Sequence, residues 1–306
     1  MNIVIVGQGA IGLLLYCQLS KVDTVNVSLK CSNSVTNPPS HISFTDYQQN
    51  TQQITLNIAN NDQLKQADLV IYCLKAYALL AELKKSSRYF SSSTPLVLCH
   101  NGMISLNELP KALLNKQPIL TMLTSHGCKK VADFTIHHTG EGYSDIGLAS
   151  GDLTISQQKQ IIYVLNKGIK KLFWQENIKQ QQWLKLAINC VINPLTALHN
   201  IDNGLILSKG FEKKIDKIIN EVVLVAQSQE VTFDIPELKQ IIKNVARLTA
   251  NNRSSMRTDI LMEKQTEIDH INGFIHQLAK SENIATPENT LLWQKIKQLE
   301  NNYLLH

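Results

Sequence analysis

Three polar side chains interrupt a nearly apolar stretch in the second half of the chain. The segment reads KLAINCVINPLTALHN (residues 185–200), and Lys185, Asn189 and Asn193 follow one another at steps of four. Residues four apart share a helix face, so a helix here carries an ammonium and two amides in one line. Its other faces are apolar, so it is expected to be buried, and buried polar groups need partners. Either a neighbouring helix supplies hydrogen bonds, or the polar line faces a cleft.

A lysine beside neutral amides suits a reaction at a ketone. When a hydride adds to a carbonyl carbon, negative charge develops on the oxygen, and an ammonium group can stabilise that charge and then donate its proton. An ordinary lysine has a pKa of about 10.4 and is protonated at neutral pH, as this role requires. Amides can orient the substrate while leaving the lysine charged.

A carboxylate further along the chain could be the partner of Lys185. Residues 255–280 predict one helix, in which Glu267 falls within an apolar stripe formed by Ile260, Ile271, Phe274 and Leu278. A carboxylate on an inward face requires a cation, and we expect Lys185 to provide it. Alternatively, Glu267 lies at the edge of the stripe and reaches solvent.

A glycine-rich loop lies near the start of the chain. GQGAIG (7–12) directly follows the β-rich run 2–6 and opens a predicted helix over 10–20. In a GxGxxG turn the first glycine permits the tight turn, the second allows a pyrophosphate to approach, and the third allows close helix packing. This context favours dinucleotide binding over a structural turn. The residues expected at the cofactor are Gly7, Gln8, Gly9, Ala10, Ile11 and Gly12.

The second strand indicates which dinucleotide binds. NAD sites usually place an acidic residue at the end of this strand, whereas residues 24–29 contain none and are followed by Lys30. A cation suits the 2′-phosphate of NADP, with Ser32 and Ser34 as further donors. NADP(H) is therefore the expected cofactor, unless Lys30 is an ordinary exposed lysine.

Strand and helix signals alternate in the first half of the chain, which predicts an α/β Rossmann-type domain with a parallel sheet. Further strands are expected at 68–74, 95–99 and 118–124, with a helix over 78–88. A hairpin is expected within 38–58. The segments 134–138 and 143–146 are expected as antiparallel additions at the edge of the sheet.

Helical patterns replace strand signals after about residue 155, which predicts an all-α C-terminal domain. We place an NADP-binding domain at 1–172 and a helical substrate domain at 173–306. Pro194 is expected to kink the helix that carries Lys185. Thr286 and Pro287 are expected to begin the last helix. The predicted helices cover 156–167, 177–198, 211–229, 236–248, 255–280 and 287–302.

Composition narrows the class of protein. The chain has 306 residues, 43% hydrophobic and 18% charged, and a net charge of +5 whose lysine pairs are scattered, so neither disorder nor nucleic-acid binding is expected. No apolar run is long enough for a membrane helix. The six cysteines form no CxxC pair and the histidines lack neighbouring ligands, so we expect no metal and a cytoplasmic location.

Several motifs together resemble the ketopantoate reductase (2-dehydropantoate 2-reductase) family from end to end. They are GQGAIG at 7–12, DLVIYCLKAY at 68–77, HNGM at 100–103, KLAINCVINPLTA at 185–197, RSSMRTDI at 253–260, TEIDHINGF at 266–274 and TPEN at 286–289. Their order and spacing agree with that family.

The resemblance implies NADPH-dependent reduction of the 2-keto acid 2-dehydropantoate to (R)-pantoate, on the way to pantothenate and coenzyme A. The family's general acid falls on Lys185, and its glutamate near the substrate hydroxyl and the cofactor falls on Glu267. Lys75 falls near the cofactor, and Cys128 is expected to touch it through its backbone. Asn101 falls where the nicotinamide meets the substrate. Besides Lys185, the family's other positions that contact the substrate fall on Asn189, Asn193, Asn203 and Ser255.

The chain departs from the family pattern at two positions. Ala78 stands where many relatives carry glutamine, and Lys30 stands where many carry arginine, which makes a bidentate contact that lysine cannot. A reductase for another 2-keto acid and a non-catalytic NADP sensor are the alternatives. The sensor is disfavoured because Lys185 and Glu267 are both present. Either a monomer or a homodimer is compatible with the sequence.

Overall fold

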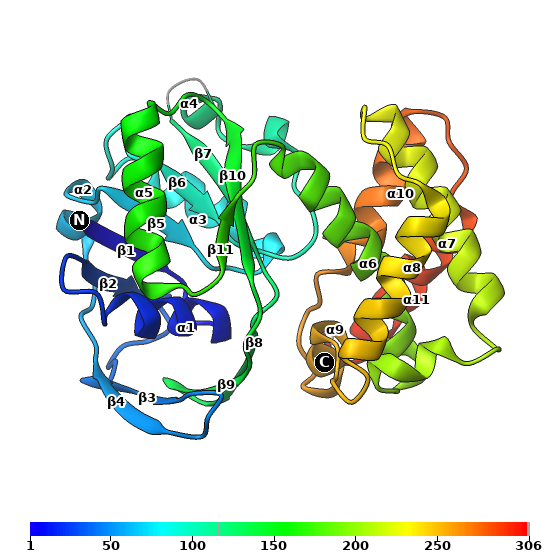
Figure 1. Cartoon of the computed structure of the whole chain (residues 1–306), viewed down its shortest axis with the longest axis horizontal. Helices are drawn as coiled ribbons and strands as arrows, with labels where there is room; N and C mark the ends of the chain where they lie inside the picture. Colours follow the sequence, from blue (N-terminus) through cyan, green and yellow to red (C-terminus); the bar gives the residue numbers. More distant parts are fainter. Residues whose placement is uncertain (115–116, 305–306) are drawn as a thin grey trace. The chain divides into compact units, whose positions relative to one another are not determined.

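A computed structural model describes residues 1–114 and 117–304 and divides them into two compact units (Figure 1). Unit 1 contains Met1–His100 and Ser105–Ile178, and unit 2 contains Asn101–Ile104 and the chain from Lys179 onward. The predicted fold class is confirmed, because unit 1 is an α/β domain and unit 2 is helical. Among the described residues no helix is long and apolar enough to cross a membrane.

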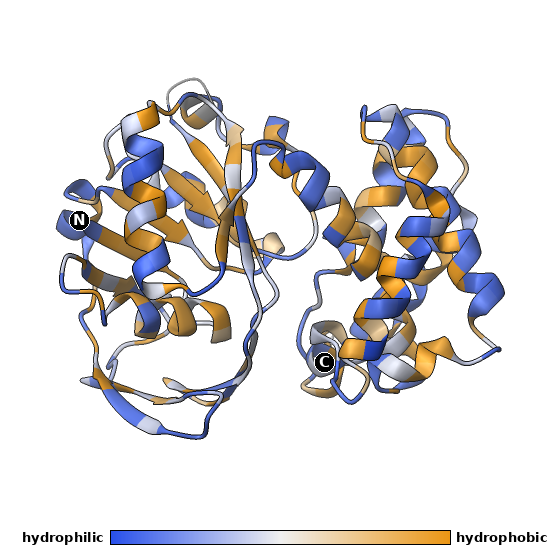
Figure 2. Ribbon diagram, viewed as in Figure 1, coloured by the Kyte–Doolittle hydropathy of each residue, from blue (hydrophilic) through white to orange (hydrophobic). Residues whose placement is uncertain are grey.

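A seven-stranded sheet forms the centre of unit 1, in the order β11-β10-β7-β6-β5-β1-β2. Five of its strands run parallel to one another; β10 pairs antiparallel with β7, and β11 pairs parallel with β10. The inner strands β5 and β6 are apolar along their whole length, and β1 is apolar from Ile3 onward, because helices cover both faces (Figure 2). The strands are β1 (Asn2–Val6), β2 (Asn26–Lys30), β5 (Leu69–Tyr72), β6 (Leu96–Leu98), β7 (Ile119–Thr124), β10 (Ser144–Ser150) and β11 (Leu172–Trp174).

Helices link these strands by crossovers. α1 (Ala10–Leu19) joins β1 to β2, and α3 (Ala76–Ser86) joins β5 to β6 in the opposite lateral direction. Right-handed crossovers therefore put α1 and α3 on opposite faces of the sheet. α5 (Ile155–Gly168) packs beside α1 (Figure 1). Three short helices complete the unit: α2 (Asn61–Lys65), η1 (Leu106–Glu108) and α4 (Lys111–Leu114).

A second sheet of four strands, in the order β4-β3-β9-β8, packs on α1. The predicted hairpin within 38–58 is confirmed as β3 (His41–Thr45) with β4 (Thr51–Thr55). The placement of 134–138 at the edge of the parallel sheet is wrong, because β9 (Thr135–Gly140) pairs with β3 and with β8 (Gly127–Ala132). Its alternating burial pattern fits a strand with one face on α1.

The segment 143–146 does join the parallel sheet in antiparallel orientation, as part of β10. It does not form the edge, because β11 pairs outside it. The sequence pattern did not predict β11, because this strand is only three residues long and lies within the region of helical signals.

Unit 2 is a group of helices around one apolar core (Figure 2). The longest is α6 (Ile178–His199), which carries Lys185. The others are η2 (Asn203–Leu207), α7 (Glu212–Ser228), α8 (Ile235–Leu248), α9 (Ser255–Leu261), η3 (Ile268–His270), α10 (Asn272–Ser281) and α11 (Pro287–Leu304). α11 begins at Pro287, as predicted.

The single helix predicted over 255–280 is wrong, because three elements occupy this range: α9, η3 and α10. The chain leaves the helical path where Glu263 adopts a φ of 53°. The Thr266 N–H then donates to the Glu300 carboxylate (2.7 Å) instead of to a helical carbonyl. Glu267 therefore lies in a turn between helices and not in a helical stripe.

Candidate active site

The three glycines of the loop after β1 have different surroundings. Gly7 has a φ of 114°, and a Cβ there would lie 2.4 Å from the Cys73 carbonyl oxygen. A Cβ on Gly12 would lie 2.0 Å from the Gly7 carbonyl oxygen. Gly9 is exposed, and the nearest atom to its ideal Cβ is 4.0 Å away. Gly7 and Gly12 are thus required by packing, whereas Gly9 leaves backbone open for a ligand to approach.

The N-terminus of α1 is available to an anion. Its N-cap is Gly9, which makes no side-chain cap, and its first turn contains no acidic residue. The first N–H groups of a helix lack intrahelical acceptors, and they carry partial positive charge. This loop and helix therefore fit the pyrophosphate of a dinucleotide.

Cys128 packs against this helix N-terminus. Its Sγ lies 3.3 Å from the Ala10 carbonyl oxygen and donates to it. Burial raises the pKa of the Cys128 thiol to about 12, so the thiol stays neutral and keeps its hydrogen for this bond. The side chain supports the loop from within the protein.

Lys30 ends β2 beside the same loop. It is half-buried, and the Gly7 N–H donates to its carbonyl oxygen (3.0 Å). Gln8 holds Ser32, two residues after Lys30, by two hydrogen bonds: its Nε2 donates to Ser32 Oγ (2.8 Å), and its Oε1 accepts from the Ser32 N–H (3.0 Å). The hydroxyls of Ser32 and Ser34 are 2.6 Å apart. The loop after β2 is therefore held in one conformation next to Lys30.

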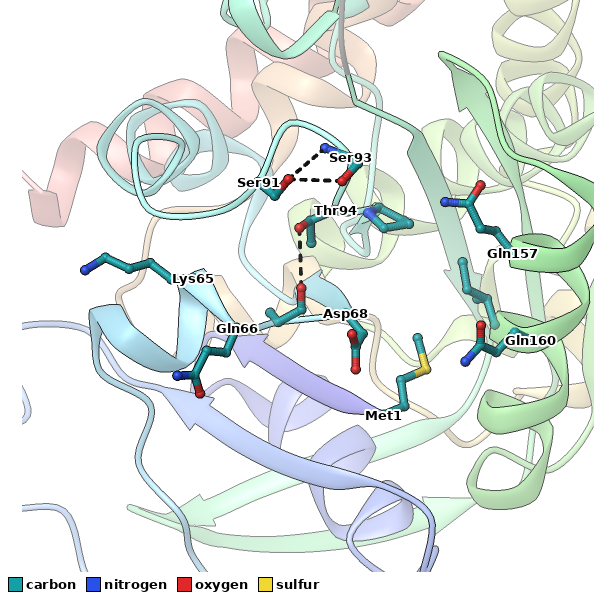
Figure 3. A pocket seen from close by; sticks show the side chains of 12 residues that line it. Met1, Lys65, Gln66, Asp68, Ser91, Ser93, Thr94, Gln157 and Gln160 are labelled. Atoms are coloured by element: carbon teal, nitrogen blue, oxygen red, sulfur yellow. Dashed lines mark hydrogen bonds between the residues drawn. The ribbon is translucent and has the colours of Figure 1, made fainter.

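Lys75 is half-buried and is the N-cap residue of α3, just beyond the carboxyl end of β5. Ligands of open α/β sheets bind at this end of the strands. A cavity of about 460 Å³ lies at the amino ends of β1, β5 and β6 instead, lined by residues such as Met1, Asp68 and Pro95 (Figure 3). Lys75 and the glycine loop do not line it, so we do not take it as the active site.

Two motifs that are distant in sequence meet in unit 2. The backbone N–H of Asn101 donates to Glu267 Oε1 (3.3 Å), and its Nδ2 donates to Glu267 Oε2 (3.2 Å). Gly102 has a φ of 71°, and a Cβ there would lie 2.3 Å from the His270 carbonyl oxygen. The Met103 N–H donates to that same oxygen (2.8 Å). Residues 101–103 thus fasten onto the turn that carries Glu267, which is only 3% exposed.

The polar line on α6 is present as the spacing predicted. Lys185 and Asn189 are half-buried, and Asn193 is buried. Thr196 extends the line by one turn, and its Oγ1 lies 2.7 Å from Ser254 Oγ. Sequence reasoning missed Thr196, although it follows Asn193 at helical spacing.

Pro194 does not interrupt α6, which continues to His199. Proline has no N–H, so the Cys190 carbonyl four residues earlier lacks its helical donor. The Asn272 side chain donates to that carbonyl (3.1 Å) and replaces the missing bond. The proline therefore ties α6 to the start of α10.

The last two predicted substrate positions lie at the start of η2 and of α9. Asn203 is buried, and its Nδ2 donates to Thr249 Oγ1 (3.0 Å). Ser255 is exposed and follows Ser254, whose hydroxyl caps α9 by accepting from the Arg257 N–H (3.1 Å).

Arg257 anchors the chain just before Asn203. Its guanidinium donates to the Asn200 side chain (2.8 Å) and forms an ion pair with Asp202. Sequence reasoning missed both Ser254 and Arg257. The serine just before a helical pattern was an available signal for a cap.

The structure thus separates the predicted residues into two groups. The glycine loop, Lys30, Lys75 and Cys128 lie in unit 1. The residues assigned to substrate and catalysis lie in unit 2: Asn101, Lys185, Asn189, Asn193, Asn203, Ser255 and Glu267. Glu267 and Asn101 are in direct contact, and Ser254 links α6 to the helix that begins at Ser255. Unit 1 has the features of a dinucleotide site, and unit 2 those of a site for a polar substrate.

Models of one known family match most of both units. The family described as "Ketopantoate reductase PanE/ApbA" matches residues 3–151, and its C-terminal counterpart matches residues 177–300. A 2-dehydropantoate 2-reductase of Vibrio cholerae is 32% identical over 308 residues, which cover 99% of both chains.

Solved structures share the fold at lower identity. A PanE/ApbA family ketopantoate reductase from Ralstonia eutropha has a TM-score of 0.86 at 21% identity, with both chains fully covered. A D-mandelate dehydrogenase bound to NADH and anilino(oxo)acetate has a TM-score of 0.88 at 21% identity, covering 99% of both chains. The chain belongs to the ketopantoate reductase family and is a nicotinamide-dependent 2-keto acid reductase.

Proposed function

We propose that the chain reduces 2-dehydropantoate to (R)-pantoate with NADPH as the hydride donor and Lys185 as the general acid. The observation that carries the proposal is the polar line of Lys185, Asn189 and Asn193 on a largely apolar stretch of α6. This helix belongs to the same unit as the hydrogen-bonded pair Asn101 and Glu267. The 32% identity to the Vibrio cholerae 2-dehydropantoate 2-reductase over nearly the whole chain supports this substrate.

Each residue has a distinct part in the proposed reaction. When NADPH is bound, its nicotinamide would supply the hydride for the ketone carbon. Lys185 stabilises the negative charge that develops on the ketone oxygen and donates a proton from Nζ. Asn189 and Asn193 orient the substrate without changing the charge around the lysine. Asn203 and Ser255 contribute further polar contacts to the substrate.

Glu267 acts as a fixed carboxylate in this scheme. It is buried, and it accepts two hydrogen bonds from Asn101. These bonds hold both of its oxygens in place and orient the Asn101 amide. A carboxylate held in this way can bind the substrate hydroxyl and support the ammonium charge of Lys185.

NADP(H) is the proposed cofactor because of the residues after β2. This strand ends in Lys30 with no acidic residue to accept from a ribose 2′-hydroxyl. Lys30 offers an ammonium to a 2′-phosphate, and Ser32 and Ser34 offer hydroxyls nearby. The Lys30→Ala variant should raise the KM for NADPH about tenfold to a hundredfold, since a hydrogen bond to a charged group contributes about 1.5–3 kcal/mol.

The KM for NADH of the same variant should remain unchanged, because NADH has no 2′-phosphate. Lys21→Ala provides a matched control, since Lys21 is an exposed lysine of the same unit. Equal loss with both cofactors would contradict the role of Lys30.

The activity itself is tested with purified protein and a panel of substrates. The oxidation of NADPH is followed by its absorbance. The substrates are 2-dehydropantoate, smaller and larger aliphatic 2-keto acids, and an aryl 2-keto acid in which a phenyl ring replaces the alkyl group. The proposal predicts the highest kcat/KM for 2-dehydropantoate with NADPH. A higher kcat/KM for an aryl or unbranched 2-keto acid would overturn the substrate and leave the reductase class standing.

A further inference from the structure

A partly buried ion pair on the last helix, Lys297 with Glu300, lies next to the turn that carries Glu267. Glu300 on α11 is 1% exposed, and its Oε1 accepts from both the N–H and the hydroxyl of Thr266 (2.7 Å each). Thr266 immediately precedes Glu267. The carboxylate therefore fixes the backbone on the N-terminal side of the proposed active-site residue.

The same pair fixes the other side of the turn through Lys297. Its Nζ lies 2.7 Å from Glu300 Oε2 and 2.9 Å from Asp269 Oδ2. Asp269 Oδ1 in turn accepts from the Trp293 indole N–H (2.7 Å). Asp269 follows Glu267 by two residues, so α11 holds the turn at both flanks.

The turn at 266–269 depends on contacts from α11 for its conformation. η3 is only three residues long, and a helix of that length is not stable alone. The Thr266 hydroxyl accepts from the Ile268 N–H (3.1 Å), which closes the turn over Glu267. Removing Glu300 would leave the Thr266 donors buried without an acceptor and the Lys297 ammonium partly buried with Asp269 alone.

We infer that Glu300 and Lys297 are positioning residues for the reaction. They hold residues 266–269 so that the Glu267 carboxylate meets Asn101 at the geometry that catalysis needs. This inference rests on the proposed role of Glu267. A displacement of about 1 Å in a catalytic group can lower the rate by about a hundredfold, so a mobile turn would reduce turnover strongly.

The variants Glu300→Ala and Glu300→Gln test this inference. Glu300→Ala should lower kcat about tenfold to a hundredfold. The KM for the dinucleotide should stay the same, because the glycine loop belongs to unit 1. Glu300→Gln retains an oxygen that can accept from Thr266 and should recover most of the lost kcat. Lys297→Met, on a side chain that is 31% exposed, serves as a second variant if Glu300→Ala does not fold.

Glu221→Ala is the matched control for a general loss of stability. Glu221 is a buried carboxylate of α7 that accepts from the Glu288 and Asn289 N–H groups (2.9 Å each) at the other end of α11. Its removal should lower the Tm to a similar extent and leave kcat of the folded enzyme unchanged. An equal loss of kcat in Glu221→Ala and Glu300→Ala would overturn the inference.

A double-mutant cycle separates the inference from the proposed function. If Glu267→Gln alone leaves kcat unchanged, the proposed role of Glu267 fails and the inference fails with it. If Glu267→Gln lowers kcat and Glu300→Ala does not, only the inference fails. The expected result is that Glu300→Ala lowers kcat in the native background and has little further effect in the Glu267→Gln background.

Discussion

Gly102 is the residue at which two sequence motifs come into contact. The backbone passes so close to His270 that no Cβ fits, and the φ of 71° lies in the left-handed region. The neighbouring Asn101 and Met103 then bond to Glu267 and His270. The glycine of the HNGM motif is therefore explained by the close approach of its backbone to His270, which ends the turn that carries Glu267.

The Gly102→Ala variant should lose both stability and turnover. A non-glycine residue at this φ costs about 1–3 kcal/mol, and the backbone contact at 2.3 Å must open as well. The opening would separate Asn101 from Glu267 and lower kcat. Gly210→Ala is the control, since a Cβ at Gly210 meets nothing within 4 Å. Wild-type Tm and kcat in Gly102→Ala would contradict this account.

Residue spacing alone predicted the polar line on α6. Lys185, Asn189 and Asn193 interrupt an apolar stretch of the chain at helical spacing, and this pattern is visible without knowledge of any contact partner. Glu267 was also singled out, but for a stripe on a helix that does not exist. Its partner Asn101 is 166 residues away in the chain, and no local pattern reveals such a contact.

At the scale of elements, two buried histidines lie beside each other: His126 immediately precedes β8, and His138 lies on β9. His126 Nδ1 lies 3.2 Å from His138 Nε2 and accepts from the Gly142 N–H (3.1 Å). Burial and the neighbouring His138 imidazole lower the pKa of His126, and burial lowers the pKa of His138. The Glu141 carboxylate opposes the lowering of both pKa values. The Lys171 ammonium further lowers the pKa of His126, and the Lys170 ammonium further lowers the pKa of His138.

Stability should therefore fall as the solution becomes acidic. The unfolded histidines bind protons below a pH of about 6.5, whereas the folded ones remain neutral to a lower pH. The unfolded state then binds more protons, so the free energy of unfolding decreases as pH falls through this window. Thermal unfolding should show a steeper loss of Tm as the pH falls below about 6.5 in the native chain than in His138→Gln.

His137→Gln is the control, because His137 is the exposed neighbour of His138 on the same strand. It should leave the slope of Tm against pH unchanged. A slope that is equal in all three proteins would show that the histidine pair does not contribute.

Long periodic elements were easier to predict than short ones. The inner strands and α6 contain continuous apolar or helical patterns, and the structure has them where they were expected. β11 is only three residues long and therefore leaves no clear pattern. The break in the helical path at 262–267 is stabilised by the hydrogen bond from the Thr266 N–H to Glu300. Such a break is a tertiary effect, because the local sequence contains neither glycine nor proline there.

At the scale of the whole molecule, the residues proposed to bind the cofactor and those proposed to bind the substrate lie in different units. The glycine loop and Lys30 are in unit 1, and Lys185 is in unit 2 together with the short segment 101–104. The change from alternating to helical patterns along the chain indicates two kinds of structure. No sequence pattern indicates that residues 101–104 belong to unit 2, because their place there depends on contacts with the turn at 267–270.

The central claim is that Lys185 is the acid of the reaction, and Lys185→Ala tests it most directly. Turnover of 2-dehydropantoate and NADPH binding, followed by fluorescence of the reduced nicotinamide, are measured on the same sample. Lys179→Ala, at an exposed lysine of the same helix, is the control. The account predicts that kcat falls at least about a hundredfold while the Kd for NADPH stays the same. Undiminished turnover in Lys185→Ala would contradict it.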